Sequence, residues 1–330
     1  MRLATVEAKG KERLCLYSGQ KLTDLNRGYA LYAQKVGKLT SFERQLNMLQ
    51  FLELGEQAIT AARKVAEFLE DILSGTEVSS PLAEEIIFSS QEVRFHPPVP
   101  RPPKILCLAG NYVEHITESG WKQVRREQTT PWVFMKPPTT TLIGHKEQIL
   151  LPKVWRDIDW EVELAVVIGR SGKYISKEQA EHHIAGYTVF NDISARELEL
   201  KKGRESREWD PFFDWFHGKC MDTFAPCGPC IALKDQIEDV QNLCIRLKVN
   251  GEVKQDSNTA NMLFPVSEVV EFISQIMTLE TGDIIATGTP SGTGAPRGEF
   301  LKPGDVVEAE VESIGTLLNP VGDESREYKG

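Results

Sequence analysis

The strongest structural signal in this chain is a run of alternating acidic and apolar residues, Asp157-Ile158-Asp159-Trp160-Glu161-Val162-Glu163-Leu164, which continues as Ala165-Val166-Val167-Ile168. Successive side chains of a β-strand point to opposite faces. The acidic side chains would therefore share one face, and the apolar ones between them would pack inward. The all-apolar continuation is typical of a strand that is buried on both faces. The run predicts a β-strand whose acidic face adjoins the core.

A row of carboxylates on one strand has two interpretations. It can be the solvated face of an edge strand, where charge prevents edge-to-edge pairing. It can also be a cation site, because stacked carboxylates raise one another's pKa unless a positive charge lies among them. Mg²⁺, Mn²⁺ and Ca²⁺ all prefer oxygen ligands. Downstream, the apolar run 187–190 ends at Asn191-Asp192, so Asp192 is either a helix cap or a third oxygen ligand.

Around this run, the chain divides into a short N-terminal part and a longer, mainly β part. Residues 1–20 predict a β-hairpin, and residues 41–73 predict a helical segment that Ser41 can cap. The proline-rich segment 95–103 predicts a stiff, extended linker. After it, short runs of β-branched and large apolar residues predict strands at 104–108, 131–135, 161–168, 184–190, 243–249, 283–286 and 306–311. We therefore expect an α+β fold that is mainly β, with a structural domain over 1–100 and a catalytic domain over 101–330.

Composition narrows the class of protein. The 330 residues carry a formal net charge of −10, so general binding of nucleic acid is not expected. No apolar run approaches the length of a membrane span and no signal core is evident, so we expect a cytoplasmic protein with reduced thiols. The motif Cys227-Gly228-Pro229-Cys230 lacks a second cysteine pair or a suitably spaced histidine, so we interpret it as packing cysteines in a turn.

Other clusters of functional side chains follow the expected strands. If residues 111–118 are helical, Tyr112, His115 and Glu118 share a face, and a His–Glu pair can act as a general base; the alternative is a surface histidine with an incidental neighbour. Lys136 and Lys219 are either solvated or aimed at an anionic substrate. The Gly/Thr loop 287–294 is either a plain turn or a source of N–H donors for an anion.

Taken together, residues 104–320 resemble the fumarylacetoacetate hydrolase family. The motifs that carry the resemblance follow one order along the chain: Gly110-Asn111-Tyr112 with His115, Lys136-Pro137, Asp159-Trp160-Glu161-Val162-Glu163, Asn191-Asp192-Ile193-Ser194-Ala195-Arg196, Gly218-Lys219, Asp222-Thr223, Thr287-Gly288-Thr289-Pro290-Ser291-Gly292 and Leu301-Lys302-Pro303-Gly304-Asp305. The resemblance implies a mixed β-sandwich roll and a homodimer.

The resemblance also implies roles for individual residues. It implies Mg²⁺ or Mn²⁺, which Ca²⁺ can replace in crystals, with the metal ligands Glu161, Glu163 and Asp192. The implied catalytic residues are His115, Glu118 and Lys219, with a basic lid over 118–128. The implied substrate-binding residues are Tyr112, Lys136, Arg196, Gly288 and Thr289. Glu199 stands where the family often has glutamine, and the long segment 197–218 is expected to shape the pocket or the dimer contact.

The expected substrate is a small anionic 2-oxo or 1,3-dicarbonyl acid. The leading hypothesis is a Mg/Mn-dependent hydrolase that cleaves a C–C bond in an acylpyruvate or related β-diketo acid through a metal-stabilised enolate, because His115 with Glu118 suits water activation. The alternative is a decarboxylase or isomerase of a small 2-oxo dicarboxylate, oxaloacetate-like or 2-hydroxymuconate-like, at the same metal site. Two further hypotheses are a non-catalytic ion-binding module and a redox protein built on Cys227 and Cys230.

Overall fold

The computed structural model describes residues 1–37, 45–74, 85–120, 122, 124–155, 157–196 and 203–324. Ser41, Glu199 and part of the expected lid lie outside these described residues.

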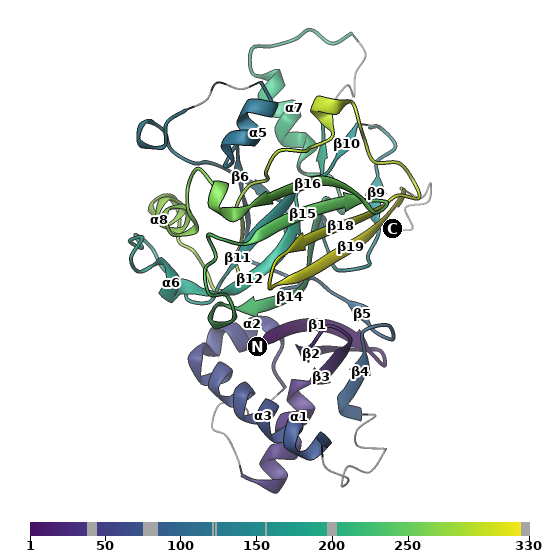
Figure 1. Cartoon of the computed structure of the whole chain (residues 1–330), viewed down its shortest axis with the longest axis vertical. Helices are drawn as coiled ribbons and strands as arrows, with labels where there is room; N and C mark the ends of the chain where they lie inside the picture. Colours follow the sequence, from purple (N-terminus) through teal and green to yellow (C-terminus); the bar gives the residue numbers. More distant parts are fainter. Residues whose placement is uncertain are drawn as a thin grey trace.

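The described chain contains α-helices, β-strands and short 3-10 helices (Figure 1). The α-helices are α1 (Leu25–Lys35), α2 (Met48–Leu54), α3 (Glu56–Ser74), α5 (Val113–Glu118), α6 (Ala180–His183), α7 (Asp210–Gly218) and α8 (Val266–Ile276). The strands are β1 (Arg2–Ala8), β2 (Lys11–Tyr17), β3 (Lys21–Asp24), β4 (Ile87–Ser89), β5 (Arg94–Phe95), β6 (Ile105–Ala109), β7 (Trp132–Lys136), β8 (Leu142–Ile143), β9 (Ile149–Leu151), β10 (Ile158–Asp159), β11 (Val162–Ile168), β12 (Ile184–Asn191), β13 (Ser194–Ala195), β14 (Ala225–Leu233), β15 (Cys244–Val249), β16 (Glu252–Asn258), β17 (Ile284–Ala286), β18 (Val306–Val311) and β19 (Gly315–Asp323).

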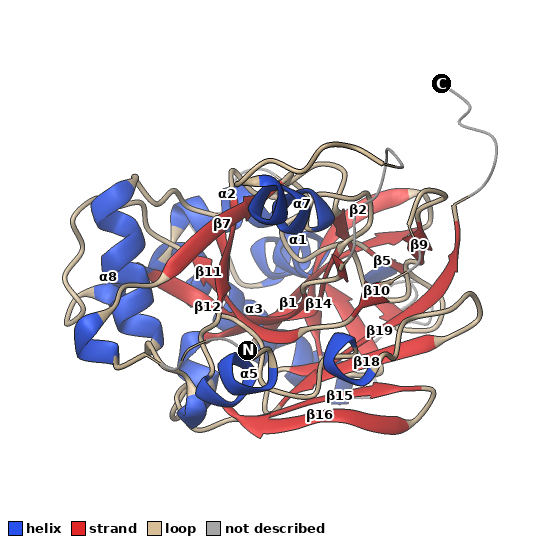
Figure 2. Cartoon of the chain, turned by 90° about the horizontal axis from the view of Figure 1, so that it is seen from above, coloured by secondary structure: helices blue, strands red, loops and turns tan. Residues whose placement is uncertain are grey.

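Two large sheets form the framework. The main sheet has the order β4-β3-β2-β1-β14-β12-β11-β17-β6-β7, with β5 added to β1 and β8 to β14. The second sheet has the order β16-β15-β18-β19-β9. Figure 2 shows β15, β16, β18 and β19 side by side along one edge of the molecule. Pairing is mostly antiparallel, with parallel pairs at β17–β6, β14–β8 and β19–β9. The mixed, mainly β architecture confirms the expected fold class.

The acidic run supplies the centre of the main sheet. Every residue of β11 is buried, and β11 pairs with β12 on one side and β17 on the other. Leu164 and Val166 join the core that contains Ile245 and Val307 of the second sheet. Ala165 and Val167 belong to two other clusters on the opposite face. Both faces of β11 are therefore covered, as the unbroken apolar run predicted, and each fully buried valine or leucine contributes roughly 1.5–3 kcal/mol.

The hairpin predicted for residues 1–20 is confirmed, and the helical segment predicted for residues 41–73 is present as two helices. β1 and β2 form the predicted hairpin. The helical segment is interrupted, because Gly55 separates α2 from α3 with a φ of 56°. Within the described residues, the cap of α2 is Asn47, whose side chain accepts from the Gln50 amide in a capping box.

The proline-rich segment packs against the N-terminal strands. The Pro98 carbonyl accepts a hydrogen bond of 2.7 Å from the Thr5 hydroxyl, and Val99 is buried. β1 also hydrogen-bonds to β14, so the N-terminal strands extend the main sheet. The division of the chain into domains near residue 100 stays a prediction.

The six cysteines are free thiols. Cys227 and Cys230 are buried within β14, so the expected turn at this motif is wrong, because the chain continues through it as a strand. Burial raises the pKa of each of these two thiols to about 12. Among the described helices, none is long and apolar enough to cross a membrane.

Candidate metal centre and cavity

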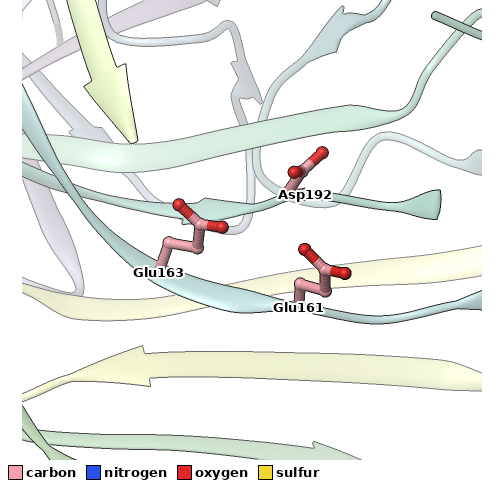
Figure 3. Close-up of side chains that lie close together, drawn as sticks. All are labelled: Glu161, Glu163 and Asp192. Carbon is pink, nitrogen blue, oxygen red and sulfur yellow. The ribbon is translucent and has the colours of Figure 1, made fainter. Parts of the chain in front are cut away.

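Three carboxylates meet where β11 begins and β12 ends. Glu163 lies on β11, Glu161 immediately precedes that strand, and Asp192 immediately follows β12. Val162 pairs with Asn191, and the Asp192 amide donates a hydrogen bond of 2.9 Å to the Glu161 carbonyl. This register brings one oxygen from each carboxylate within 4.8 Å of the others. Figure 3 shows the three carboxylate groups around a common space.

Asp159 does not join this group, although the alternation predicted one shared acidic face. The strand is interrupted after Asp159, because β10 pairs with β13 whereas β11 pairs with β12 and β17. The buried Asp159 carboxylate instead accepts from the amides of Trp160 (2.8 Å), Gly294 (2.6 Å) and Ala295 (3.0 Å). It therefore anchors the loop that follows β17.

Three cationic side chains neutralise most of the acidic charge. Lys219 donates to Glu161 at 2.8 Å and to Asp192 at 2.7 Å. Lys136 donates to Asp192 and, at 3.0 Å, to the Ile193 carbonyl. Arg196 bridges Asp159 at 2.8 Å and Glu161 at 2.7 Å. These three cations face four carboxylates, so the fully ionised cluster carries one net negative charge.

That excess charge falls on Glu163. Burial, followed by the charges of Asp192 and Glu161, raises the pKa of Glu163 well above its usual range. One oxygen of Glu163 accepts from the Gly288 amide at 2.7 Å, and the other is buried without a hydrogen-bond partner. Burial also acts to raise the pKa of Glu161, but Lys219 and Arg196 hold that pKa well below its usual range.

The donor set fits a hard divalent cation. Three clustered carboxylates supply the oxygen ligands that Mg²⁺ and Mn²⁺ prefer. The buried oxygen of Glu163 lacks a positive partner of its own, which is an expensive arrangement for a charged group. A divalent cation would supply that partner.

A cavity of about 280 Å³ opens beside Glu161. Its size suits a small molecule. Phe134 and Trp215 form an apolar wall, and the Lys219 ammonium lies 5.5 and 6.0 Å from the centres of their rings. The full lining is Leu108, Ala109, Gly110, His115, Glu118, Ser119, Phe134, Glu161, Arg196, Trp215, Lys219, Thr289, Thr293, Ala295 and Pro296. Trp215 lies on α7, so the expectation that segment 197–218 shapes the pocket is confirmed for this residue.

The structure places five of the expected catalytic and substrate-binding residues at this cavity: His115, Glu118, Arg196, Lys219 and Thr289. Burial lowers the pKa of His115, so its imidazole is neutral at pH 7. Burial also acts to lower the pKa of Lys219, but Asp192 and Glu161 raise it overall, so the ammonium stays charged.

Three expected substrate-binding residues do not line the cavity. Tyr112 is fully buried in the main core and bridges to Met262. Lys136 is fully buried against Asp192, and the Gly288 amide donates to Glu163. Tyr112 packs in the core, whereas Lys136 and the Gly288 amide bind carboxylates of the protein itself. None of the three lines the cavity.

The Gly/Thr loop 287–294 binds carboxylates of this chain. The amides of Gly288, Gly292 and Gly294 donate to Glu163, Glu118 and Asp159, respectively. This differs from the expectation that the loop offers its amides to a substrate, because three protein carboxylates already accept from them.

Gln255 on β16 also fixes this loop, and sequence reasoning missed it. Its side chain accepts from the Val162 amide at 3.0 Å and donates to the Thr289 hydroxyl and the Pro290 carbonyl at 2.9 Å. Gln255 lies in a polar strand far from every motif, which is why no pattern singled it out.

Glu118 and Ser119, at the start of the expected lid, line the cavity, but none of the lid's described basic side chains does. Arg126 pairs with Glu268, and Lys122 and Arg125 are exposed. Figure 1 shows α5, which precedes this segment, at the same end of the molecule as α7.

Comparison with known proteins agrees with these observations. The chain is 40% identical over 288 residues to a mitochondrial oxaloacetate tautomerase, FAHD2A, of Bos taurus, with 86% of this chain and 82% of that protein covered. A 5-carboxymethyl-2-hydroxymuconate delta-isomerase from Mycobacterium smegmatis matches with a TM-score of 0.67 and 27% identity, covering 98% of this chain and all of that one. A maleylpyruvate hydrolase from Sphingobium sp. SYK-6, solved with manganese(II) and pyruvate, matches with a TM-score of 0.68, covering 98% of this chain and all of that one. At 24% identity this last likeness shows the fold alone.

The family comparison covers the region that builds the site. Residues 104–322 match the family described as fumarylacetoacetate (FAA) hydrolase, C-terminal, and this range contains the carboxylate cluster and the whole cavity lining. The chain therefore belongs to the fumarylacetoacetate hydrolase family and is a metal enzyme of that family.

Proposed function

We propose that this protein is a metal-dependent isomerase that interconverts the keto and enol forms of a small, oxaloacetate-like 2-oxo dicarboxylate. The observation that carries the proposal is a small cavity in which a buried neutral imidazole faces a charged lysine and arginine beside the carboxylate cluster. The oxaloacetate tautomerase relative supports the substrate class, and the muconate isomerase supports the reaction type.

The reaction moves one proton. A proton leaves C3 of the keto acid, the electron pair of that C–H bond becomes the C2–C3 double bond, and the C2 oxygen gains a proton. A divalent cation bound by Glu161, Glu163 and Asp192 would act as a Lewis acid toward the C2 oxygen.

The side chains of the cavity have complementary roles in this step. His115 takes the C3 proton, because its burial keeps the imidazole neutral at pH 7. Lys219 places fixed positive charge near the oxygen on which negative charge develops. Arg196 lines the cavity while bonded to Asp159 and Glu161, and it attracts a substrate carboxylate.

The hydrogen bonds of Glu118 favour isomerisation over the C–C hydrolysis that was expected from the sequence. Hydrolysis was expected because a base formed by His115 with Glu118 suits water activation. Both Glu118 oxygens instead accept hydrogen bonds, from the Gly292 amide at 2.6 Å and the Thr293 hydroxyl at 2.9 Å. Proton transfer within one substrate needs a base but no activated water. The homodimer, the cytoplasmic location and the choice between Mg²⁺ and Mn²⁺ stay predictions; the bovine relative is a mitochondrial protein.

A direct test uses chelator-treated protein with and without Mg²⁺ or Mn²⁺. Freshly dissolved oxaloacetate is followed through the ultraviolet absorbance of its enol, with the spontaneous rate subtracted, while pyruvate is measured in parallel. We expect metal-dependent acceleration of the keto–enol exchange without pyruvate. Pyruvate released from oxaloacetate would establish decarboxylation instead, and pyruvate released from an acylpyruvate would establish C–C hydrolysis.

A further inference from the structure

The helix that carries His115 is too short to hold its own position. α5 has 6 residues, Val113–Glu118, and isolated helices of that length are not stable in water. Its place at the cavity therefore depends on contacts with the rest of the protein. Ile116 packs into the protein, the Glu114 carboxylate accepts from the Ser257 hydroxyl at 2.5 Å, and Glu118 accepts from the loop after β17.

The loop 287–294, to which Glu118 is hydrogen-bonded, is held in place by contacts with β16 and Asp159. Gly292 has a φ of 102°, and a Cβ there would lie 2.2 Å from the Lys254 carbonyl oxygen of β16, so the loop lies directly against that strand. Two residues further on, the Gly294 amide donates to Asp159. Asp159 is joined through Arg196 to Glu161. A continuous series of contacts thus runs from the end of α5 to the carboxylate cluster.

We propose that Glu118 is a positioning residue, which holds α5 and therefore His115 at the cavity by bonding Gly292 and Thr293. The inference rests on the proposed role of His115 as the base. It assigns Glu118 a function through hydrogen-bond geometry, so an uncharged side chain that preserves the geometry preserves the function.

Replacing Glu118 by glutamine or by alanine separates the effect of its hydrogen bonds from the effect of its charge. In Glu118→Gln, the amide oxygen can still accept from the Gly292 N–H, and the amide nitrogen can donate to the Thr293 hydroxyl. Glu118→Ala removes both bonds. Thr293→Val removes one bond and leaves the carboxylate charge in place. Glu114→Gln is the matched control, because it removes one charge from the same helix, keeps an acceptor for Ser257 and does not line the cavity.

We expect Glu118→Ala to lower kcat about 10- to 100-fold with little change in KM, because a small displacement of the base affects the chemical step most. Glu118→Gln should recover most of that loss in kcat, because it keeps both hydrogen bonds. Thr293→Val should lower kcat about 3- to 10-fold, as expected for the loss of one hydrogen bond. Glu114→Gln should match the wild type in rate and pH profile.

A second measurement does not depend on turnover. Hydrogen–deuterium exchange should rise in segments 113–118 and 290–295 of Glu118→Ala and Thr293→Val, and should stay at the wild-type level in Glu118→Gln. If the wild type proves not to be a tautomerase, the proposed function fails but the exchange data still decide the role of Glu118. The inference is overturned if Glu118→Gln is as slow as Glu118→Ala, or if exchange in both segments is unchanged in Glu118→Ala.

Discussion

Replacing Glu163 by glutamine should stabilise the metal-free protein and weaken its response to metal. Glu163 is buried beside two other carboxylates, with one oxygen unpartnered. Two unit charges 4.8 Å apart, the outer limit for these oxygens, repel by about 3 kcal/mol at an effective dielectric constant of about 20. Lys136 and Lys219 offset part of this repulsion, and protonation of Glu163 limits the rest. We therefore expect Glu163→Gln to gain about 1–3 kcal/mol without metal, or about 2–6 °C in Tm.

When metal is added, the wild type should become more stable than Glu163→Gln. A ligand present at 100 times its Kd stabilises the folded state by about 2.7 kcal/mol. The wild type should gain this stabilisation from Mn²⁺, whereas Glu163→Gln has lost a charged oxygen ligand and should gain much less. The assay is thermal unfolding in chelator and in a Mn²⁺ series, followed by circular dichroism.

Asp159→Asn is the matched control for this experiment. Asp159 lies in the same acidic run, but its carboxylate accepts from three amides and from Arg196. Breaking this buried pair should cost about 3–5 kcal/mol with or without metal. The reasoning is refuted if Glu163→Gln is less stable than the wild type in chelator, or if both proteins gain equally from Mn²⁺.

Three other variants test separate predictions. Lys219→Met should bind Mn²⁺ more tightly, because it removes a positive charge beside the carboxylates, yet should lose turnover about 100-fold or more; calorimetric titration together with the activity assay checks both, and weaker Mn²⁺ binding would contradict the placement of the charge. Burial lowers the pKa of His145 to about 4 in the folded state, so the unfolded chain takes up this proton first as pH falls. His145 should therefore cost up to about 3 kcal/mol of stability between pH 6.5 and pH 4; urea unfolding at pH 5 and pH 7.5 should show a smaller difference in His145→Gln than in the wild type, and an equal difference would count against the assignment. The double variant Cys227→Ala/Cys230→Ala should keep metal-dependent activity, since both thiols are buried in β14 away from the cavity; loss of activity with intact folding would favour the redox hypothesis.

Local patterns in the sequence were sufficient for the hairpin of β1 and β2, for seven further strands and for the metal-site candidates, but they did not predict β14, β16 or β19. The alternation at Glu161 and Glu163 placed both side chains on one face, and the apolar strand before Asp192 located a third carboxylate at its end. These features depend on neighbours in the sequence, where periodicity carries the information.

Contacts between residues far apart in the sequence determine which of the candidate side chains meet, and local patterns do not predict such contacts. Asp159 separates from Glu161 because the chain changes strand partners between β10 and β11. The bond between Glu118 and Gly292 joins residues 174 positions apart, and no local pattern predicts it. Tyr112 shares a predicted helix face with His115, but spacing does not tell which side of α5 meets the core.

The pairing of β1 with β14 has a consequence for how the protein is made. Arg2 lies opposite Ala232, so β1 pairs with a strand that is synthesised more than two hundred residues later. Contacts of such high sequence separation form slowly. Until β14 arrives, the edge of β1 stays open to pairing with strands of other chains. The hairpin of β1 with β2, packed on α1 and α3, is the local unit that can form early and protect one side of that edge.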